Sequence, residues 1–483
     1  MNPTQIQEVF EAQHSNRWHI AQSTAAQRIA KLKTLRGALL ARRHEIVTAM
    51  QKDFGKCQAE VAMSEIAPVT DEIAFVCARL KRWMRPKRVG THLFTLGSRS
   101  EVRYEPKGQV LILAPWNYPI HLFLLPLVGA IAAGNVVMMS ASDRTTHTEA
   151  VLTRLINETF PVNEVAAFSG GVAAAEALME CPFDHVFFTG SPAVGKKIMA
   201  KAAQHLATVT LELGGKSPAV LDVSCDIPKA ALSIAFGKFL NAGQTCISPD
   251  HVWVPRSLCA EFQSSIIKLI REFYGDTPEQ RRASPDFARV VDARGWQRMK
   301  HLLYSSIAAG AQAVIGGETD ESSCYVAPTV LSGVTTTMPI MQEEIFGPLL
   351  PMLAYDSLDD VLAFIQSGGK PLALYAFGRD SVFIERMLNE TTAGGTVINN
   401  TLLQIVNSHL PFGGAGQSGQ GSYHGHHSFL TFSHERAVVH QGGLIASLVP
   451  IPHPPYSKMK AIEKIVLKQK SGLGPLPIDQ SKV

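Results

Sequence analysis

The sequence predicts an α/β fold, with a parallel, doubly wound sheet followed by a second αβ domain. From Gln109 onward, short apolar runs alternate with helix-like segments, which is the order of a parallel sheet covered by helices on both faces. The length of 483 residues exceeds one simple core and suffices for two or three packed domains. Its hydrophobic share of 46% and charged share of 18% are those of an ordinary globular chain.

The N-terminal part of the chain predicts helices and then a pair of strands. Apolar residues recur at helical spacing through residues 1–85. Pro86 interrupts this pattern, and the alternation within 87–106 indicates two strands. We therefore expect a small strand pair to separate the helices from the parallel sheet.

The predicted parallel sheet is built from short segments in a regular order. They are a strand at 110–116, a helix at 119–134, strands at 135–140 and 185–190, a helix at 191–206 and a strand at 207–215. A second αβ run extends from 218 to about 400. Ligands bind beyond the carboxyl ends of such strands, where this chain places Trp116–Asn117, Thr189–Gly190 and Glu212–Gly214.

Composition excludes several classes of partner. The formal net charge is only +4, and no basic stripe with interleaved aromatics is present, so we expect no nucleic-acid partner. No secretory signal is found, and no apolar stretch approaches the roughly 18 residues of a membrane-spanning helix. Seven cysteines without framework spacing are typical of reduced intracellular thiols. The basic segment 456–470 is amphipathic enough for weak peripheral contact with a membrane, or it could fold over a substrate entrance.

Cys246 is the cysteine that stands out. It lies in FLNAGQTCISPD, where small and polar residues follow an apolar helix, which suits a thiol on an accessible loop. A catalytic thiol needs a lowered pKa or a nearby base. A structural thiol would fit the same residues when they are considered alone.

Glu212 and Asn117 each follow a predicted strand. Glu212 could act as a general base on water, or its carboxylate could simply bond backbone amides. Asn117 could direct its amide towards developing negative charge, with the backbone amide of Cys246 as a second donor, or it could be a turn asparagine.

Two further segments suggest a nucleotide. In 187–195, a strand is followed by a glycine-serine turn and a helix start, where backbone N–H groups can hold a phosphate; Ser191 and Pro192 would equally serve as an ordinary helix cap. In 341–351, Glu344 could accept hydrogen bonds from ribose hydroxyls and Phe346 could lie against a flat ring, although a surface acidic pair beside a core aromatic also fits.

Taken together, these segments resemble the aldehyde dehydrogenase superfamily from about Lys52 to about Arg436. The motifs are PWNYP, FTGSPAVGK, LELGGKSP, GQTC, EEIFGP and LPFGGAGQSG, in the order the family has them. The segments YGDTPEQ, GKPLALYAFG and SGQGSYHGHHSFLTFSH are similar to the class 3 branch, which includes fatty and aromatic aldehyde dehydrogenases.

The resemblance implies NAD(P)-dependent oxidation of an aldehyde, long aliphatic or aromatic, to the acid. Cys246 would be the nucleophile that forms a thiohemiacetal and then a thioester, Glu212 the base that hydrolyses it, and Asn117 the oxyanion donor. Retention of Glu212 favours hydrolysis over transfer to CoA. The residues implied to contact NAD or NADP are Trp116, Ser140, Asp143, Gly190, Ser191, Pro192, Ala193, Val194, Gly195, Leu213, Gly214, Glu344 and Phe346.

One stretch departs from the family pattern. A lysine and a glutamate usually hold the adenosine ribose, whereas this chain has Ser140 and Asp143 at those positions. A charge-assisted hydrogen bond contributes about 1.5–3 kcal/mol, so we expect a weakened or differently built grip on the cofactor. Arg144 is a candidate replacement cation, and neighbouring groups are an equal alternative.

The resemblance also marks two residues for substrate contact. They are Tyr118 and His424. Tyr118 could instead orient the nucleophile loop, and a histidine at a surface interface is the alternative for His424. His426 and His427 have no acidic or cysteine partner at ligand spacing, so no metal site is predicted.

The class 3 resemblance implies a cytoplasmic homodimer with a projecting hairpin. We expect a cofactor-binding domain at 1–87 and 106–213 and a catalytic domain at 214–398. Bridging elements are expected at 88–105 and 399–440, followed by a C-terminal tail at 441–483.

Two alternative functions compete. A cysteine acyl hydrolase would share Cys246 and Glu212 but would have no use for Glu344 and Phe346. A catalytically lapsed binding protein is suggested only by the altered stretch around Ser140.

Overall fold

The computed structural model describes residues 3–91, 95, 97–442 and 454–455. The chain divides into two compact units, one formed by 1–85 with 104–435 and the other by 86–103 with 436–483. Among the described residues, no helix has the length and apolarity needed to cross a bilayer.

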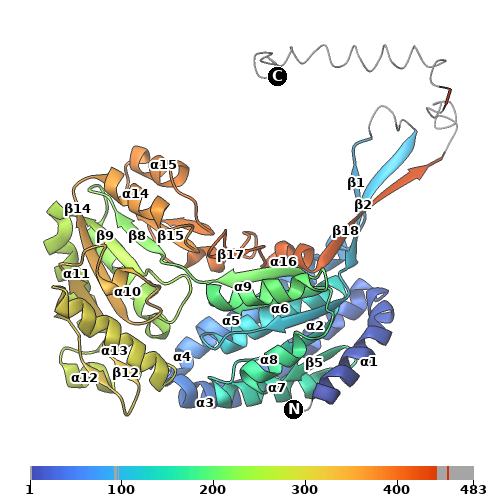
Figure 1. Ribbon diagram of the computed structural model, residues 1–483, viewed down its shortest axis with the longest axis horizontal. Helices are drawn as coiled ribbons and strands as arrows, with labels where there is room; N and C mark the ends of the chain where they lie inside the picture. Colours follow the sequence, from blue (N-terminus) through green and yellow to red (C-terminus); the bar gives the residue numbers. More distant parts are fainter. Residues whose placement is uncertain (1–2, 92–94, 96, 443–453, 456–483) are drawn as a thin grey trace. The chain divides into compact units, whose positions relative to one another are not determined.

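The first sheet of the larger unit has six strands in the order β17-β7-β6-β3-β4-β5 (Figure 1). Five of them run parallel, and β17 pairs antiparallel with β7. The strands are β3 (Gln109–Leu113), β4 (Val136–Ser140), β5 (Val165–Phe168), β6 (His185–Gly190), β7 (Thr208–Leu213) and β17 (Gly419–Gln420). The predicted parallel sheet is confirmed, and β5 is a strand that the sequence pattern did not single out.

Both faces of this sheet are buried, which explains its continuous apolar runs. Along β3, Val110 and Ile112 pack into one core cluster, while Leu111 and Leu113 pack into another. Successive side chains of a strand point to opposite faces, so a run with apolar residues at every position is a strand covered on both sides.

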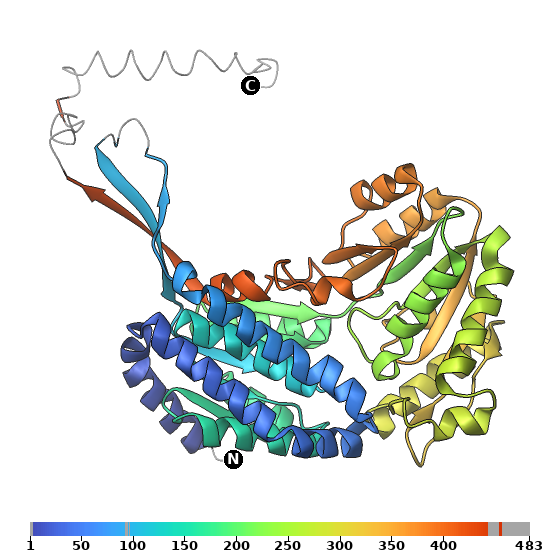
Figure 2. The same ribbon diagram turned by 180° about the vertical axis from the view of Figure 1, so that it is seen from behind.

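Helices cover the two faces. One layer centres on α6, of which every residue is buried, and blue helices of the N-terminal segment cover it in Figure 2. The other layer contains α1, α8 and α9. The helices are α1 (Pro3–Ala21), α2 (Ala25–Ala41), α3 (Arg43–Phe54), α4 (Gln58–Val61), a π-helical turn η1 (Ala62–Ile66), α5 (Ala67–Trp83), α6 (Pro119–Ala133), α7 (Thr146–Thr159), α8 (Gly171–Leu178) and α9 (Pro192–Ala203). The prediction that 1–85 is helical is confirmed.

The second sheet has seven strands in the order β10-β13-β14-β9-β8-β15-β16, parallel except for β10. The strands are β8 (Pro218–Leu221), β9 (His251–Pro255), β10 (Gln312–Ile315), β13 (Thr329–Ser332), β14 (Leu349–Tyr355), β15 (Ala373–Phe377) and β16 (Gly395–Ile398). Its helices are α10 (Ile227–Phe239), α11 (Cys259–Tyr274), α12 (Pro278–Ala283), α13 (Ala293–Ala308), α14 (Leu358–Ser367) and α15 (Ser381–Asn389), and a short α16 (Gly425–Thr431) packs on α6 of the first layer. The predicted second αβ domain is confirmed.

The smaller unit contains a three-stranded sheet of order β1-β2-β18. The strands are β1 (Lys87–Val89), β2 (Ser98–Pro106) and β18 (Ser433–Gln441). β1 and β2 pair antiparallel, so the strand pair predicted within 87–106 is confirmed. The basic segment 456–470 lies outside the described residues.

Candidate active site

Cys246 follows a tight backbone turn at the end of α10. Asn241, Ala242 and Gly243 all have positive φ, at 53°, 51° and 73°. A Cβ on Gly243 would lie 2.3 Å from the carbonyl oxygen of Gly347, so only glycine fits at this position. The turn ends the helix and carries the chain into a loop, where the Cys246 side chain stays partly accessible.

Asn117 and Tyr118 contact the residues immediately before Cys246. The Asn117 amide nitrogen donates to the Gln244 carbonyl at 3.1 Å, and the Tyr118 hydroxyl lies 2.7 Å from the Thr245 hydroxyl. Both residues stand between β3 and α6, where the carboxyl edge of the first sheet meets the cysteine loop. The structure thus brings Asn117 and Tyr118 against the two residues that precede Cys246.

Two carboxylates influence the Cys246 thiol. Burial, and then the nearby Glu344 and Glu212, raise the pKa of this thiol to about 12, while the backbone N–H groups of Cys246 and Ile247 oppose the shift. The resting side chain is therefore a protonated thiol at neutral pH. The opposing N–H of Cys246 is the backbone donor that the sequence analysis paired with Asn117.

Glu212 ends β7 and is 3% exposed. Neither of its carboxylate oxygens has a hydrogen-bond partner among the described residues, and burial raises its pKa well above the ordinary value. The alternative that Glu212 bonds backbone amides is thus wrong in this structure. A buried carboxyl without such partners is a candidate for proton transfer.

Glu344 lies against the two glycines that follow β7. A Cβ on Gly214 would lie 2.1 Å from a Glu344 carboxylate oxygen, and the N–H of Gly215 donates to this carboxylate. Burial, and then Asp250, raise the pKa of Glu344 to about 8. Gly214 therefore has to be glycine, because a side chain there would overlap the Glu344 carboxylate.

The turn between β6 and α9 is an exposed helix start. The Ser191 hydroxyl accepts from the Val194 N–H at 3.4 Å, and Pro192 occupies the first helical turn. A Cβ on Gly195 would lie 2.8 Å from the Leu213 side chain, so this glycine allows α9 to pack on β7. The capping role of Ser191 and Pro192 is confirmed, and the positive end of the α9 helix dipole lies at this turn.

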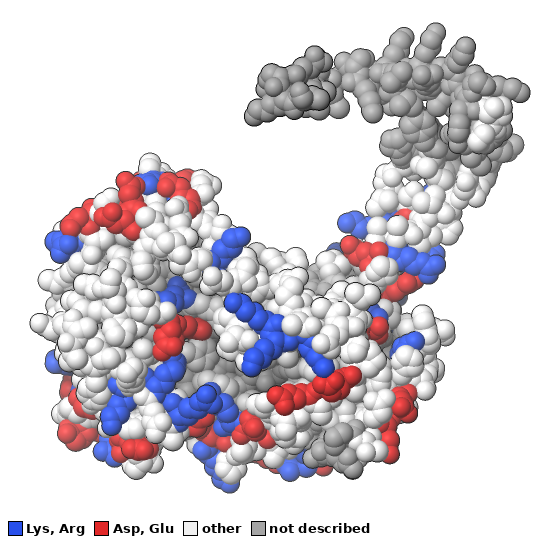
Figure 3. Space-filling view, in the orientation of Figure 1, with Lys and Arg blue, Asp and Glu red and all other residues white. Residues whose placement is uncertain are grey.

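A cavity of about 580 Å³ lies on one side of this turn, between α8 and α9. Ser140, Asp143 and Val194 line it, together with the α9 lysines Lys197 and Lys201. Figure 3 shows basic side chains over α9 facing an acidic row across a hollow in the surface. The volume suits the nucleoside half of a dinucleotide.

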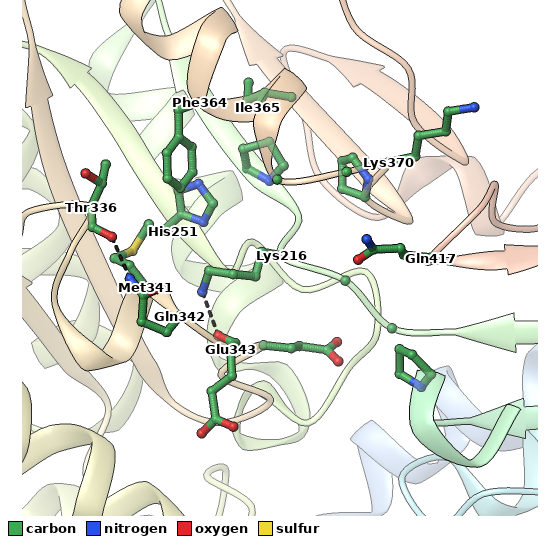
Figure 4. A pocket seen from close by; sticks show the side chains of 18 residues that line it. Lys216, His251, Thr336, Met341, Gln342, Glu343, Phe364, Ile365, Lys370 and Gln417 are labelled. Carbon is green, nitrogen blue, oxygen red and sulfur yellow. Dashed lines mark hydrogen bonds between the residues drawn. The ribbon is translucent and has the colours of Figure 1, made fainter. Parts of the chain in front are cut away.

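A second cavity of about 470 Å³ lies on the other side of the turn (Figure 4). Pro192, Gly214 and Glu344 line it on the side of the cleft. Lys216 projects from its wall, where its ammonium donates to the Glu343 carbonyl at 2.8 Å and pairs with Asp250 at 2.5 Å. The two cavities together gather residues expected to contact the two ends of a cofactor.

The Trp116 ring contacts both Phe346 and Arg144. Phe346 meets it edge-on at 5.4 Å between ring centroids, and the Arg144 guanidinium lies 4.3 Å from its centroid. Arg144 also pairs with Asp292, so it does not stand free as the replacement cation considered from the sequence. Lys197, which the sequence analysis did not consider, lines the nucleoside-sized cavity instead.

His424 is buried, with 4% of its surface exposed, so the alternative of a surface histidine is wrong. Its ring stacks on Phe412 and lies 6.4 Å from that of His121. Burial lowers the pKa of His424 to about 3, and its Nε2 has no partner among the described residues. The ring is therefore neutral and retains one unused polar atom.

A buried ion pair behind Asn117 escaped the sequence analysis. Lys56 and Glu65 lie 3.0 Å apart with fully buried side chains, and the Lys56 ammonium reaches the Asn117 carbonyl at 3.5 Å. In the sequence, Lys56 and Glu65 are marked only as charged residues on faces that are otherwise apolar. Many solvated helices show the same pattern.

The sequence matches the aldehyde dehydrogenase family over residues 1–438. It is 43% identical to a 4,4'-diaponeurosporen-aldehyde dehydrogenase of Staphylococcus aureus, over 90% of this chain and 93% of that protein. It is 39% identical to aldehyde dehydrogenase family 3 member B1 of Homo sapiens, over 97% of both chains. The fold matches a structure of Staphylococcus aureus AldH in its substrate-bound state with a TM-score of 0.90 and 40% identity, covering 95% of this chain and 99% of that one.

The site has a thiol and two carboxylates beside a parallel, doubly wound sheet. This arrangement is typical of a nucleotide-dependent enzyme. The chain belongs to the aldehyde dehydrogenase family. It is an NAD(P)-dependent oxidoreductase that acts on aldehydes.

Proposed function

We propose that this enzyme oxidises its aldehyde through a thioester on Cys246. The gathering of Cys246, Asn117 and Glu212 at one end of the first sheet supports this proposal most directly. The Cys246 thiol releases its proton to water, its sulfur bonds to the aldehyde carbon, and the carbonyl π electrons move onto oxygen, giving the anion of a thiohemiacetal. The Asn117 amide and the N–H of Cys246 then stabilise the oxyanion.

A bound NAD or NADP would supply the hydride acceptor that takes two electrons from the substrate carbon of the thiohemiacetal. This leaves an acyl group on Cys246. Glu212 takes a proton from water, the resulting hydroxide adds to the thioester, and the Cys246 thiolate leaves with the acid as product. No described residue donates a hydrogen bond to the Glu212 carboxylate, and this supports the role because its oxygens are available to a water.

The residues of the cleft fit a dinucleotide at the start of α9. Gly190 directly precedes this helix start, and the positive end of the α9 helix dipole suits the pyrophosphate. The residues proposed to contact the cofactor are Trp116, Ser140, Asp143, Gly190, Ser191, Pro192, Ala193, Val194, Gly195, Leu213, Gly214, Glu344 and Phe346. We propose that Glu344 serves the ribose next to the nicotinamide and that Ser140 and Asp143 face the adenosine.

The proposed substrate is a long aliphatic or aromatic aldehyde. Tyr118 and His424 are the proposed contacts, since both are buried and the first touches the cysteine loop. The relative from Staphylococcus aureus is named as a 4,4'-diaponeurosporen-aldehyde dehydrogenase.

We further propose a cytoplasmic homodimer. In this assembly, two subunits would be bridged by residues 88–105 and 399–440. The cofactor would be bound by the domain of residues 1–87 and 106–213, and catalysis would be carried by the domain of residues 214–398. The separate three-stranded sheet supports a bridging role because it belongs to its own compact unit.

The test is a series of short aliphatic, long aliphatic and aromatic aldehydes, each assayed with NAD and with NADP. Reduced nicotinamide and acid should appear in equal amounts, and kcat/KM should rise with chain length or aromaticity. Ester cleavage with no nicotinamide reduction for any aldehyde would instead indicate an acyl hydrolase. Failure to bind either cofactor at millimolar concentration would indicate a catalytically lapsed protein.

A further inference from the structure

The start of α6 has no cap of its own. Its N-cap is Tyr118, whose side chain makes no capping hydrogen bond, and Pro119 at the first turn has no N–H. The next two N–H groups, of Ile120 and His121, are buried and need acceptors. Asn117 directly precedes this N-cap residue in the chain.

Glu65 supplies those acceptors from 55 residues away. Its Oε2 accepts from the N–H of Ile120 at 3.0 Å and from that of His121 at 3.1 Å. Glu65 lies in the π-helical turn η1, which separates α4 from α5. Such turns interrupt a helix at functional positions, and a carboxylate at a helix N-terminus is favoured by the helix dipole.

Lys56 joins Glu65 to the peptide of Asn117. Its ammonium lies 3.0 Å from Glu65 Oε1 and 3.5 Å from the Asn117 carbonyl oxygen, and it sits 4.4 Å from the centroid of the Tyr118 ring. Neither Lys56 nor Glu65 has any exposed side-chain surface. The ion pair therefore contacts the Asn117 carbonyl and the first two N–H groups of α6, on either side of Tyr118.

The same peptide is held from the cysteine loop as well. Asn241 donates its side-chain amide to the Asn117 carbonyl at 2.8 Å, and its own N–H donates to Glu60 at 3.0 Å. Lys56 and Asn241 thus both contact the Asn117 carbonyl, while the Asn117 side-chain amide donates to the Gln244 carbonyl in the loop of Cys246.

We propose that the buried Lys56–Glu65 pair is a positioning device, which fixes the Asn117 amide in the orientation that stabilises the oxyanion. This inference rests on the proposed role of Asn117 and extends it to two residues that touch no substrate. A buried pair costs desolvation energy and contributes little net stability, so its place behind Asn117 points to geometry rather than to stability alone.

The first test compares two variants, Lys56→Met and Lys56→Met/Glu65→Gln. In the double variant, the glutamine still offers an acceptor to the N–H groups of α6, but it removes the Glu65 charge that the loss of Lys56 leaves unpaired. We expect kcat for aldehyde oxidation to fall about ten- to hundredfold in both variants, because misplacing an oxyanion donor forfeits part of its contribution. KM for the aldehyde should change less than about threefold, since substrate binding does not use the oxyanion.

Arg28→Met is the matched control. Arg28 is also a buried cation, and it holds the far end of α6 by donating to the Ala132 carbonyl at 3.0 Å. This variant should lower the melting temperature without lowering kcat. If Arg28→Met lowers kcat as much as Lys56→Met does, general loosening of α6 explains both and the proposal is wrong.

A double-mutant cycle with Asn117→Ala separates this inference from the proposed function. Once the Asn117 amide is absent, Lys56→Met should lower kcat less than about threefold further. A full multiplicative loss in that background would overturn the positioning role, as would an unchanged kcat in the folded Lys56→Met/Glu65→Gln enzyme. If Asn117→Ala alone leaves kcat unchanged, the proposed oxyanion role fails instead.

Discussion

Arg144 forms a bidentate ion pair with Asp292, with its Nε and Nη2 lying 2.6 and 2.7 Å from the two carboxylate oxygens. The pair joins the loop after β4 to the N-cap of α13. The same guanidinium lies against Trp116, at the rim of the cofactor cleft. Arg144 therefore links elements of the two sheets and is already neutralised by a partner.

Because Arg144 is neutralised by Asp292, it should not select between the two cofactors. We expect Arg144→Met to change the Kd of NAD and the Kd of NADP by the same factor. Titration of both cofactors by nicotinamide or tryptophan fluorescence checks this. A loss of NADP affinity at least fivefold greater than the loss for NAD would show that Arg144 binds the 2′-phosphate after all.

Ser140 leaves the nucleoside-sized cavity without a cation at its β4 wall. Introducing one with Ser140→Lys should tighten NADP by about tenfold or more, since one charge-assisted hydrogen bond contributes about 1.5–3 kcal/mol. Ser140→Thr, which adds bulk without charge, is the control. An unchanged Kd for both cofactors in the lysine variant would mean that neighbouring groups, Lys197 first, already compensate.

Burial, and then the charge of Glu344, raise the pKa of the Cys246 thiol to about 12. Its alkylation by iodoacetamide should therefore be slow at pH 7 and accelerate with pH beyond the range of an ordinary thiol. The pKa of Glu344 is about 8, so its charge opposes the thiolate mainly above that pH. Glu344→Gln should accordingly speed alkylation above pH 8 and have little effect at pH 6. Mass spectrometry confirms which cysteine reacts, and an equal acceleration at pH 6 would contradict the electrostatic cause.

Gly243 controls the turn that presents Cys246. Alanine there would adopt φ +73° and place its Cβ 2.3 Å from the Gly347 oxygen, so the loop must shift. We expect Gly243→Ala to lose at least about 1 kcal/mol of stability and to lower kcat at least tenfold. Gly37→Ala, within α2 and with nothing within 4 Å, is the control and should be neutral or stabilising. Thermal unfolding and steady-state kinetics measure both, and a fully active Gly243→Ala enzyme would show that the turn does not hold the thiol.

The sheets were predictable because local signals agreed with the fold. The strand β3 and the helix α6 are apolar at every position, which only an element buried on all sides allows. By contrast, β5 is four residues of VAAF, two of them alanine, and such a short run carries little strand propensity.

The site was predictable for residues within motifs and not for residues that act across the fold. Cys246, Glu212 and Asn117 each stand at the end of a recognisable strand or helix. Glu65 contacts α6 from 55 residues away, and the direction of its side chain depends on a π-helical turn that no local sequence pattern predicts. Arg144 was considered as a free cation because its partner Asp292 lies 148 residues further along the chain.

The central claim is that Cys246 carries an acyl group that Glu212 helps water to remove. The most direct test mixes Glu212→Gln enzyme rapidly with NAD and an aldehyde. We predict a burst of reduced nicotinamide equal to the number of active sites, followed by very slow turnover. The intact protein should gain the mass of the aldehyde less two hydrogens, on the peptide that contains Cys246. Steady turnover at the unsubstituted rate without a burst, or an adduct on another residue, would contradict the account.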